Sequence, residues 1–434
     1  MILRLFKRKA ESSFIQSSER NNSKLAKHSK LASIESSMDP ISDIAYITID
    51  MPTHIYPILG YLSELEAQGI LYDVYGPKNI MKSVLEKRGQ NQFGFEELIW
   101  NNGDAPKFFD ATYQSFLKTV PVIEAIWKDN GKKPKLIIGD MIAPYAKYLA
   151  KKHDIPLLVF HSNYFVSQLS EKRFHERMAA EFGKLQRDES LLPLQKEVEN
   201  KYNVTIERGL QVAIQGDRNI SSLPAFLGDP ISLKNDKFSY IGPAFRDENN
   251  NNNESFDIDP EFMLSNDTLI YVSLGTCSPN IAGISFYETI IDALGDTEHK
   301  VLLSVAFGKA EELIARGLPK NIIVKSWVPQ IRVLEHSKLF ISHVGAGGLM
   351  EAMLNGVPII AVPNFGDQPI NAEMVERLNV GRQIKDKSVE GVKKIVEEVL
   401  QDEGIRESCE KYKKMIDPMA SKRKFVDIVK SMMK

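Results

Sequence analysis

The sequence is poor in cysteine, in long apolar runs and in charge of one sign, and each shortage excludes a class of protein. Two cysteines, Cys277 and Cys409, cannot build a disulfide framework, so we expect a reducing compartment, the cytoplasm. No run of 18 apolar residues is present, which excludes a membrane-spanning helix. The 55 basic and 57 acidic residues leave a formal charge of −2, so no electrostatic field draws the chain to nucleic acid.

The first 41 residues lack apolar periodicity. Ser, Asn, Lys and Glu dominate up to Ser37, and this composition is typical of a disordered tail. A second interpretation is a targeting segment or surface anchor, because Ile2, Leu3, Leu5 and Phe6 lie beside basic residues. The segment has no apolar core of the length found in signal peptides.

Short apolar runs alternate with helical stretches from residue 42 onward, which predicts parallel sheets covered by helices. A polar run from Asp247 to Asn253 divides this alternation in two. We therefore predict an α/β protein of two doubly wound domains, residues 42–246 and 262–415, joined by a linker over 247–261. Residues 416–434 are predicted to form a charged helix that packs back on the first domain.

The predicted strands of the first domain are Ile44–Ile49, Leu71–Tyr75, Lys135–Ile138 and Pro156–Phe160. Its predicted helices are Pro57–Gln68, Ala105–Trp127, Pro144–Lys152 and a charged insertion over Ser170–Tyr202. The predicted strands of the second domain are Thr268–Leu274, Lys300–Val305, Ile322–Lys325, Leu339–Ser342 and Pro358–Val362, with a helix at Ser285–Leu294. In such folds ligands bind beyond the carboxyl ends of the strands, so we expect the functional residues there.

The most informative stretch runs from Trp327 to Gln368. Within it a short strand leads into His343, then into the turn Gly345-Ala346-Gly347-Gly348 and a helix. Bare glycine amides at a helix N-terminus form an anion site that suits a diphosphate. The turn is flanked by an aromatic residue, an amide, an acid and an Asp-Gln pair. Together these side chains are suited to bind the base, the ribose and the sugar of a nucleotide sugar. These residues are Trp327, Gln330, Glu351, Asp367 and Gln368.

This stretch resembles the nucleotide-sugar signature of family-1 glycosyltransferases, the UDP-glycosyltransferase superfamily. It is most similar to the soluble bacterial type that includes the macrolide glycosyltransferases. The plant version has Trp-Asn-Ser where this chain has Ala346-Gly347-Gly348, which leaves only backbone amides for the phosphates. The resemblance implies the GT-B fold, in which two doubly wound domains face an interdomain cleft.

The resemblance also implies a role for each residue of a donor site. Trp327 would stack on uracil, Gln330 would bond base or ribose, and Glu351 would accept from ribose hydroxyls. His343 would donate to a phosphate and help to supply positive charge, and Asp367 with Gln368 would hold sugar hydroxyls. The full implied set is Gly275, Thr276, Trp327, Val328, Gln330, His343, Gly345, Gly347, Gly348, Glu351, Asp367 and Gln368, with Asn371 as a further candidate.

Two residues of the first domain carry the chemistry that the resemblance implies. His54 is expected on the strand-to-helix loop three residues before Pro57, where the family places its catalytic histidine. Asp140 ends an apolar strand at the family's position for a carboxylate that orients the histidine and stabilises imidazolium. The alternatives are a structural or exposed histidine and an aspartate that caps the helix beginning at Pro144.

The resulting expectation is an inverting, metal-independent transfer of a hexose, with glucose as the expected sugar, from a UDP-sugar to a small, mostly apolar alcohol or phenol. No metal cluster is visible, and Asp257-Ile258-Asp259 is interpreted as a chance match to a metal-binding Asp-x-Asp motif. No cofactor is expected beyond the donor, which is a co-substrate, and the chain is expected to be a monomer or dimer. A sugar-nucleotide epimerase and a non-catalytic nucleotide-sugar-binding protein are the alternatives. We expect the acceptor wall to include Phe160, Asn163 and Phe165.

Overall fold

The structure, a computed structural model, describes part of the chain. The described residues are 40–434 without 50, 84, 86–87, 96–104, 165–191, 206–213, 229–231, 245–261, 263–267, 276–283, 306–308 and 365. The chain divides into two compact units, Met1–Pro40 and Ile41–Lys434, and every element below belongs to the second. The predicted tail, the linker, Thr276, Phe165 and the Asp257–Asp259 motif lie outside the described residues.

The first sheet has seven parallel strands in the order β3-β2-β1-β4-β5-β6-β7. Its strands are β1 (Ile44–Ile47), β2 (Asp73–Pro77), β3 (Gln92–Phe95), β4 (Leu136–Asp140), β5 (Leu157–His161), β6 (Arg218–Ser221) and β7 (Phe238–Tyr240). The helices between them are α2 (Pro52–Ala67), α3 (Lys78–Ser83), α4 (Ala105–Asp129), α5 (Pro144–His153) and α7 (Leu192–Tyr202).

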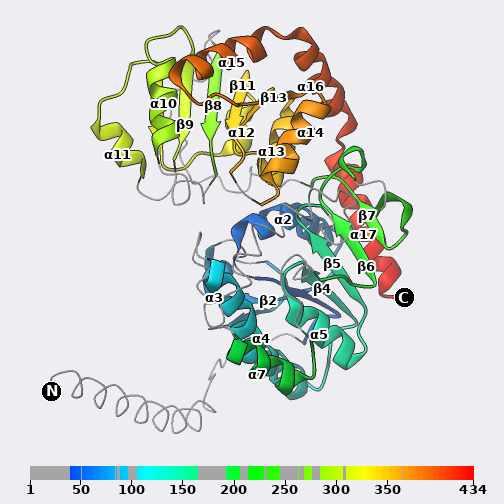
Figure 1. The fold of residues 1–434 in the computed structure, drawn as a ribbon. Coiled ribbons are helices and arrows are strands. Elements are labelled where there is room, and N and C mark those ends of the chain that lie inside the picture. Colours follow the sequence, from blue (N-terminus) through cyan, green and yellow to red (C-terminus); the bar gives the residue numbers. More distant parts are fainter. Residues whose placement is uncertain are drawn as a thin grey trace, which may run out of the picture. The chain divides into compact units, whose positions relative to one another are not determined.

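The second sheet has six parallel strands in the order β10-β9-β8-β11-β12-β13 (Figure 1). Its strands are β8 (Leu269–Ser273), β9 (Lys300–Ser304), β10 (Ile322–Lys325), β11 (Leu339–Ser342), β12 (Ile359–Ala361) and β13 (Gly381–Gln383). Its helices are α10 (Ser285–Leu294), α11 (Lys309–Ala315), α12 (Gln330–Leu334), α13 (Ala346–Asn355), α14 (Gln368–Arg377), α15 (Val389–Gln401) and α16 (Glu403–Met415).

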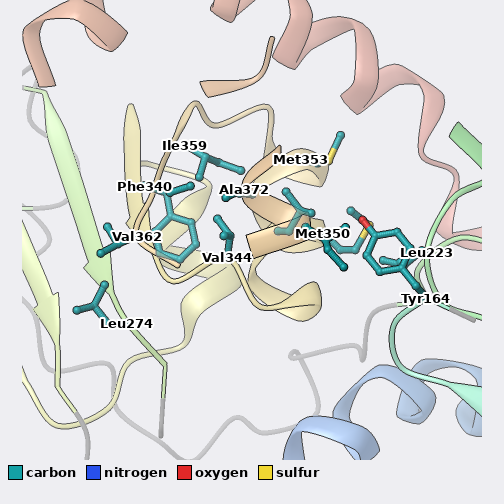
Figure 2. Close-up of a cluster of buried hydrophobic side chains, with 14 of the residues drawn as sticks. Tyr164, Leu223, Leu274, Phe340, Val344, Met350, Met353, Ile359, Val362 and Ala372 are labelled. Carbon is teal, nitrogen blue, oxygen red and sulfur yellow. The ribbon is translucent and has the colours of Figure 1, made fainter. Parts of the chain in front are cut away.

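Burial on both faces explains why the central strands are apolar throughout. In β1, Ala45 and Ile47 belong to one buried cluster, while Ile44 and Tyr46 belong to another. A strand covered by helices on both sides has no solvated face, so it shows a continuous apolar run instead of an alternating one. Figure 2 shows the corresponding packing in the second sheet, where Phe340 of β11 lies among other apolar side chains.

The order of the strands fixes where a ligand can bind. In each sheet the chain reverses its direction of winding between two neighbouring strands, β1 and β4 in the first and β8 and β11 in the second. Beyond the carboxyl ends of strands at such a switch point lies the preferred ligand position of an open α/β sheet. His54 follows β1 and Asp140 ends β4, while Gly275 follows β8 and His343 follows β11.

The last helix, α17 (Pro418–Met432), packs against the first sheet's layer although it follows the second sheet in sequence (Figure 1). Phe425, Val426 and Val429 are buried in the same apolar cluster as the inner face of α2. The ring centroids of Phe425 and Tyr61 are 5.1 Å apart. Lys430 Nζ donates to Gln68 Oε1 at 2.7 Å, which joins the exposed rims of the two helices.

The helix after β1 begins earlier than the sequence predicted. It starts at Pro52, not at Pro57, so His54 lies in the first turn of α2 and not on a loop. Pro52 occupies the first turn, where its fixed φ is favourable and its missing N–H removes no helical hydrogen bond. Pro57 lies inside the helix, where proline usually ends or kinks a helix, and this rule gave the wrong start.

Candidate functional site

His54 and Asp140 form the polar centre at the switch point of the first sheet. His54 Nδ1 lies 3.2 Å from both carboxylate oxygens of Asp140. Asp140 is 1% exposed, and its Oδ1 also accepts from the backbone N–H of Ile142 at 2.9 Å. The N-cap of α5 is Ala143 without a side-chain cap, so Asp140 does not cap that helix. The Asp140 contact engages Nδ1 and leaves Nε2 of the imidazole for a substrate.

The environment raises the pKa of His54 above its ordinary value. Burial lowers the pKa, but the charge and hydrogen bond of Asp140 raise it, and the charge of Asp367 raises it further. The carboxylates therefore outweigh desolvation, as expected for a histidine with an opposite charge in contact. Asp367 follows β12 in the second sheet, so groups from both sheets act electrostatically on the same imidazole.

A second histidine, His161, was missed by the sequence analysis. It ends β5, the strand next to β4, and is completely buried. Burial lowers the pKa of His161 to about 4, although Asn219 and the charge of Asp140 act in the opposite direction. A neutral imidazole therefore lies within electrostatic reach of the His54–Asp140 pair. Its place at the end of a central strand was the signal that sequence reasoning passed over.

The glycines after β8 and β11 make room for the ring of His343. A Cβ at Gly275 would lie 2.5 Å from His343 Cε1, and one at Gly345 would lie 2.8 Å from His343 Nε2. Gly275 also has a φ of +78°, a conformation that other residues rarely adopt. Burial lowers the pKa of His343 to about 4, so the ring is neutral near pH 7. Burial thus acts against the positive charge that the sequence analysis expected of this residue.

The N-terminus of α13 lies beside Asp367. Gly345 is the N-cap without a side-chain cap, and the backbone N–H of Ala346 donates to Asp367 Oδ2 at 3.3 Å. Gly347 is exposed, and no atom lies within 4 Å of a Cβ built on it. Open space before amides at the positive end of a helix suits an approaching anion.

Asn371 holds both the turn at Val344 and the carboxylate of Asp367. Its Nδ2 donates to Val344 O at 2.8 Å and to Asp367 Oδ2 at 2.9 Å. Val344, between His343 and Gly345, has a φ of +54°, which is unusual for a β-branched residue. Asn371 is completely buried, so it acts by holding this turn and is not placed to touch a sugar directly.

Asp367 and Gln368, the predicted sugar pair, have different surroundings. Burial raises the pKa of Asp367 and outweighs the hydrogen bonds from Asn371 and Ala346, which lower it. Gln368 is 4% exposed, and its Oε1 accepts from the backbone N–H of Asn364 at 2.8 Å. Gln368 therefore also shapes the loop that it follows.

The residues predicted to bind the nucleoside lie just before α12, at its first residue and within α13. Trp327 is 61% exposed, which excludes a role as a core aromatic, whereas Val328 is buried. Gln330 Nε2 donates to Glu351 Oε2, and Gln330 Oε1 accepts from the phenol of Tyr271 at 3.0 Å. The sequence analysis did not single out Tyr271, because its position inside an apolar strand predicted a core residue only.

The acceptor wall is corrected by the structure. Phe160 is 1% exposed and packs edge-on against Tyr61, with ring centroids 5.7 Å apart, so it belongs to the core. Alternation along β5 turns Phe160 toward α2 and α17. Asn163 is half-buried, and its backbone O accepts from Ser221. Its Oδ1 has no hydrogen-bond partner among the described residues.

The described residues contain neither a metal-binding cluster nor a membrane-spanning helix. Within them no group of three or more His, Cys, Asp or Glu side chains is arranged to hold a metal ion. In the same part of the chain, no helix combines the length and apolarity needed to cross a bilayer.

The chain is similar to proteins that are named as glycosyltransferases. The model of the UDP-glucuronosyl and UDP-glucosyl transferases matches residues 255–417. The NDP-glycosyltransferase YjiC of Bacillus subtilis is 27% identical over 347 residues, covering 78% of this chain and 83% of the relative. The oleandomycin glycosyltransferase of Streptomyces antibioticus is 24% identical and covers 79% of each chain.

Solved structures share the fold. The glycosyltransferase of kitacinnamycin superposes with a TM-score of 0.75 at 23% identity, covering 90% of this chain and 99% of the other. The calicheamicin glycosyltransferase CalG4 gives a TM-score of 0.68 at 19% identity, with coverage of 90% and 98%. The two parallel-sheet domains are therefore those of the GT-B fold.

Proposed function

We propose that the chain is a family-1 glycosyltransferase that transfers a hexose, glucose, from UDP to a hydroxyl of a small and mostly apolar acceptor. The transfer inverts the anomeric configuration and needs no metal ion. The observation that carries this proposal is the contact of His54 Nδ1 with buried Asp140, in the electrostatic field of Asp367.

The proposed reaction is a single displacement. His54 Nε2 removes the proton of the acceptor hydroxyl while its oxygen bonds to the anomeric carbon. The bond from that carbon to the diphosphate oxygen breaks, and UDP leaves with the electron pair, so an α-linked donor gives a β-glycoside. Asp140 holds the tautomer and stabilises the imidazolium that forms, as the carboxylate of a catalytic triad does.

The donor site supports the proposal with groups that suit each part of UDP-glucose. Exposed Trp327 offers a face for uracil, and Glu351 offers a carboxylate for ribose hydroxyls. The open space before Gly347 admits the diphosphate to the N-terminus of α13. Helix dipole and backbone amides would stabilise the leaving diphosphate, because His343 is neutral.

The test is a direct assay with UDP-glucose, other UDP- and TDP-sugars, and a panel of phenols and macrolides, read by mass shift. Glycosylated product should appear, and exhaustive chelation should leave its rate unchanged. His54→Ala should lower kcat by roughly 10²–10⁴ while donor affinity stays close to wild type. His153→Ala is the control, because this part-buried histidine contacts Glu124 and lies outside the proposed site, and it should keep the wild-type kcat.

The outcomes separate the competing functions. Conversion of the donor without acceptor would point to an epimerase, and donor binding without any product would point to a binding protein. Full activity of His54→Ala on an aliphatic alcohol would remove the general-base mechanism.

A further inference from the structure

The hydroxyl of Tyr271 lies at the start of a buried hydrogen-bond chain that ends in the nucleoside site. Tyr271 donates to Gln330 Oε1 at 3.0 Å, and Gln330 Nε2 donates to Glu351 Oε2. The chain links β8 to the first residue of α12 and to the middle of α13. We propose that Tyr271 is a positioning residue that sets ribose recognition by orienting Gln330 and, through it, Glu351.

The two hydrogen bonds specify one orientation of the Gln330 amide. The carboxylate of Glu351 can only accept, so it requires the amide nitrogen, and the amide oxygen is left to accept from the phenol of Tyr271. A flipped amide would bring two oxygens together at Glu351. Without the phenol, the amide oxygen would lose this hydrogen bond, and the Gln330 side chain would be held less firmly beside Glu351.

The ring of Tyr271 is itself held rigidly. It is 1% exposed and stacks on Phe340 of the neighbouring strand, with centroids 5.0 Å apart and planes at 4°. Tyr271 and Phe340 are register partners across β8 and β11. Burial raises the pKa of the phenol, so the hydroxyl keeps its proton near neutral pH and can donate.

Gln330 also connects this chain to the segment that precedes it. It begins α12, two residues after buried Val328 and three after exposed Trp327. A Gln330 side chain held by Tyr271 therefore restrains the start of α12, three residues after Trp327.

The test rests on the proposed function, because it uses UDP as the ligand. The affinities of wild type and Tyr271→Phe are measured by calorimetry for UDP and for its 2′,3′-dideoxy analogue, which lacks the ribose hydroxyls. Tyr271→Phe should weaken UDP by roughly three- to tenfold, the range expected for one lost hydrogen bond. The affinity for the dideoxy analogue should fall much less. The ratio of the affinity for UDP to that for the analogue should therefore decrease in Tyr271→Phe. With saturating donor, kcat should change less than twofold.

Tyr75→Phe is the matched control, because Tyr75 is equally buried in the first sheet and its hydroxyl accepts from Trp127 Nε1. It should leave the preference for UDP unchanged. In a Glu351→Ala background, Tyr271→Phe should have little further effect on UDP affinity. Equal weakening of both nucleotides, or no change in either, would overturn the inference. Wild-type protein that fails to bind UDP would instead contradict the proposed function.

Discussion

At the scale of single residues, the pair His54–Asp140 determines how activity should depend on pH. The base must be neutral, and the charges of Asp140 and Asp367 raise the pKa of His54. We therefore expect kcat/KM to rise with pH along a limb that lies above the ordinary histidine value of about 6.5. In Asp140→Asn the main raising effects disappear while burial remains, so the limb should move to lower pH as the maximal rate falls. A limb that stays in place would show that Asp140 does not act on His54. The profile is measured with an acceptor that does not itself titrate in this range.

A substitution at exposed Trp327 should change UDP binding without changing the stability of the fold. It is 61% exposed, so its removal costs the fold little buried contact. Trp327→Ala should weaken UDP binding by about 1–3 kcal/mol, the usual magnitude of base–aromatic stacking. The free energy of unfolding in urea should remain within about 0.5 kcal/mol of wild type. Calorimetry with UDP checks the first value, and unchanged affinity would exclude stacking.

At the scale of elements, the His343 ring packs against two glycines, one in the turn after β8 and one at the start of α13. Gly275→Ala would place a methyl group against His343 at a φ of +78°. It should destabilise the protein by at least about 1–2 kcal/mol and weaken UDP binding. Gly347→Ala is the control, because its methyl would meet no neighbour within 4 Å. It should stabilise α13 by up to about 1 kcal/mol and weaken only UDP binding. Urea unfolding with UDP titration tests both, and equal stability of the two variants would contradict this account.

The elements that the sequence predicts are those with continuous apolar runs. Two elements have the bounds that were predicted, strand Leu339–Ser342 and helix Ser285–Leu294. The strand is buried throughout, and the helix is buried on its inner face. Strands β6 and β13 were missed, since Arg218-Asn219 and Gly381-Arg382-Gln383 carry too little apolar character to stand out. Their pairing is decided by neighbouring strands, which a local pattern does not contain.

The candidate site divides in a similar way. The family resemblance predicted His54 and Asp140, which the fold brings into contact although they are 86 positions apart. The resemblance could not show that Phe160 faces the core or that burial keeps His343 neutral. Both depend on which side chains surround a residue, and this is a property of the packed structure.

At the scale of the whole molecule, α17 makes the first domain depend on the last residues of the chain. Phe425 is completely buried against Tyr61 and the inner face of α2. Phe425→Ala should lower the free energy of unfolding by about 3–5 kcal/mol, the cost of emptying a buried aromatic site. Met419→Ala, on the exposed side of the same helix, should change it by less than about 0.5 kcal/mol. Chemical denaturation compares the two, and equal values would mean that α17 does not support the first domain.

The return of α17 to α2 has a consequence for the living cell, where the chain emerges from the ribosome N-terminus first. The seven strands of the first sheet are all synthesised before any strand of the second. Yet the apolar face of α2 that meets Phe425 stays uncovered until the final residues are released. Synthesis of the first sheet is therefore separated from synthesis of its last covering helix by the whole of the second sheet. A chain that ends before Pro418 would lack this cover, and the apolar face of α2 would be open to chaperones.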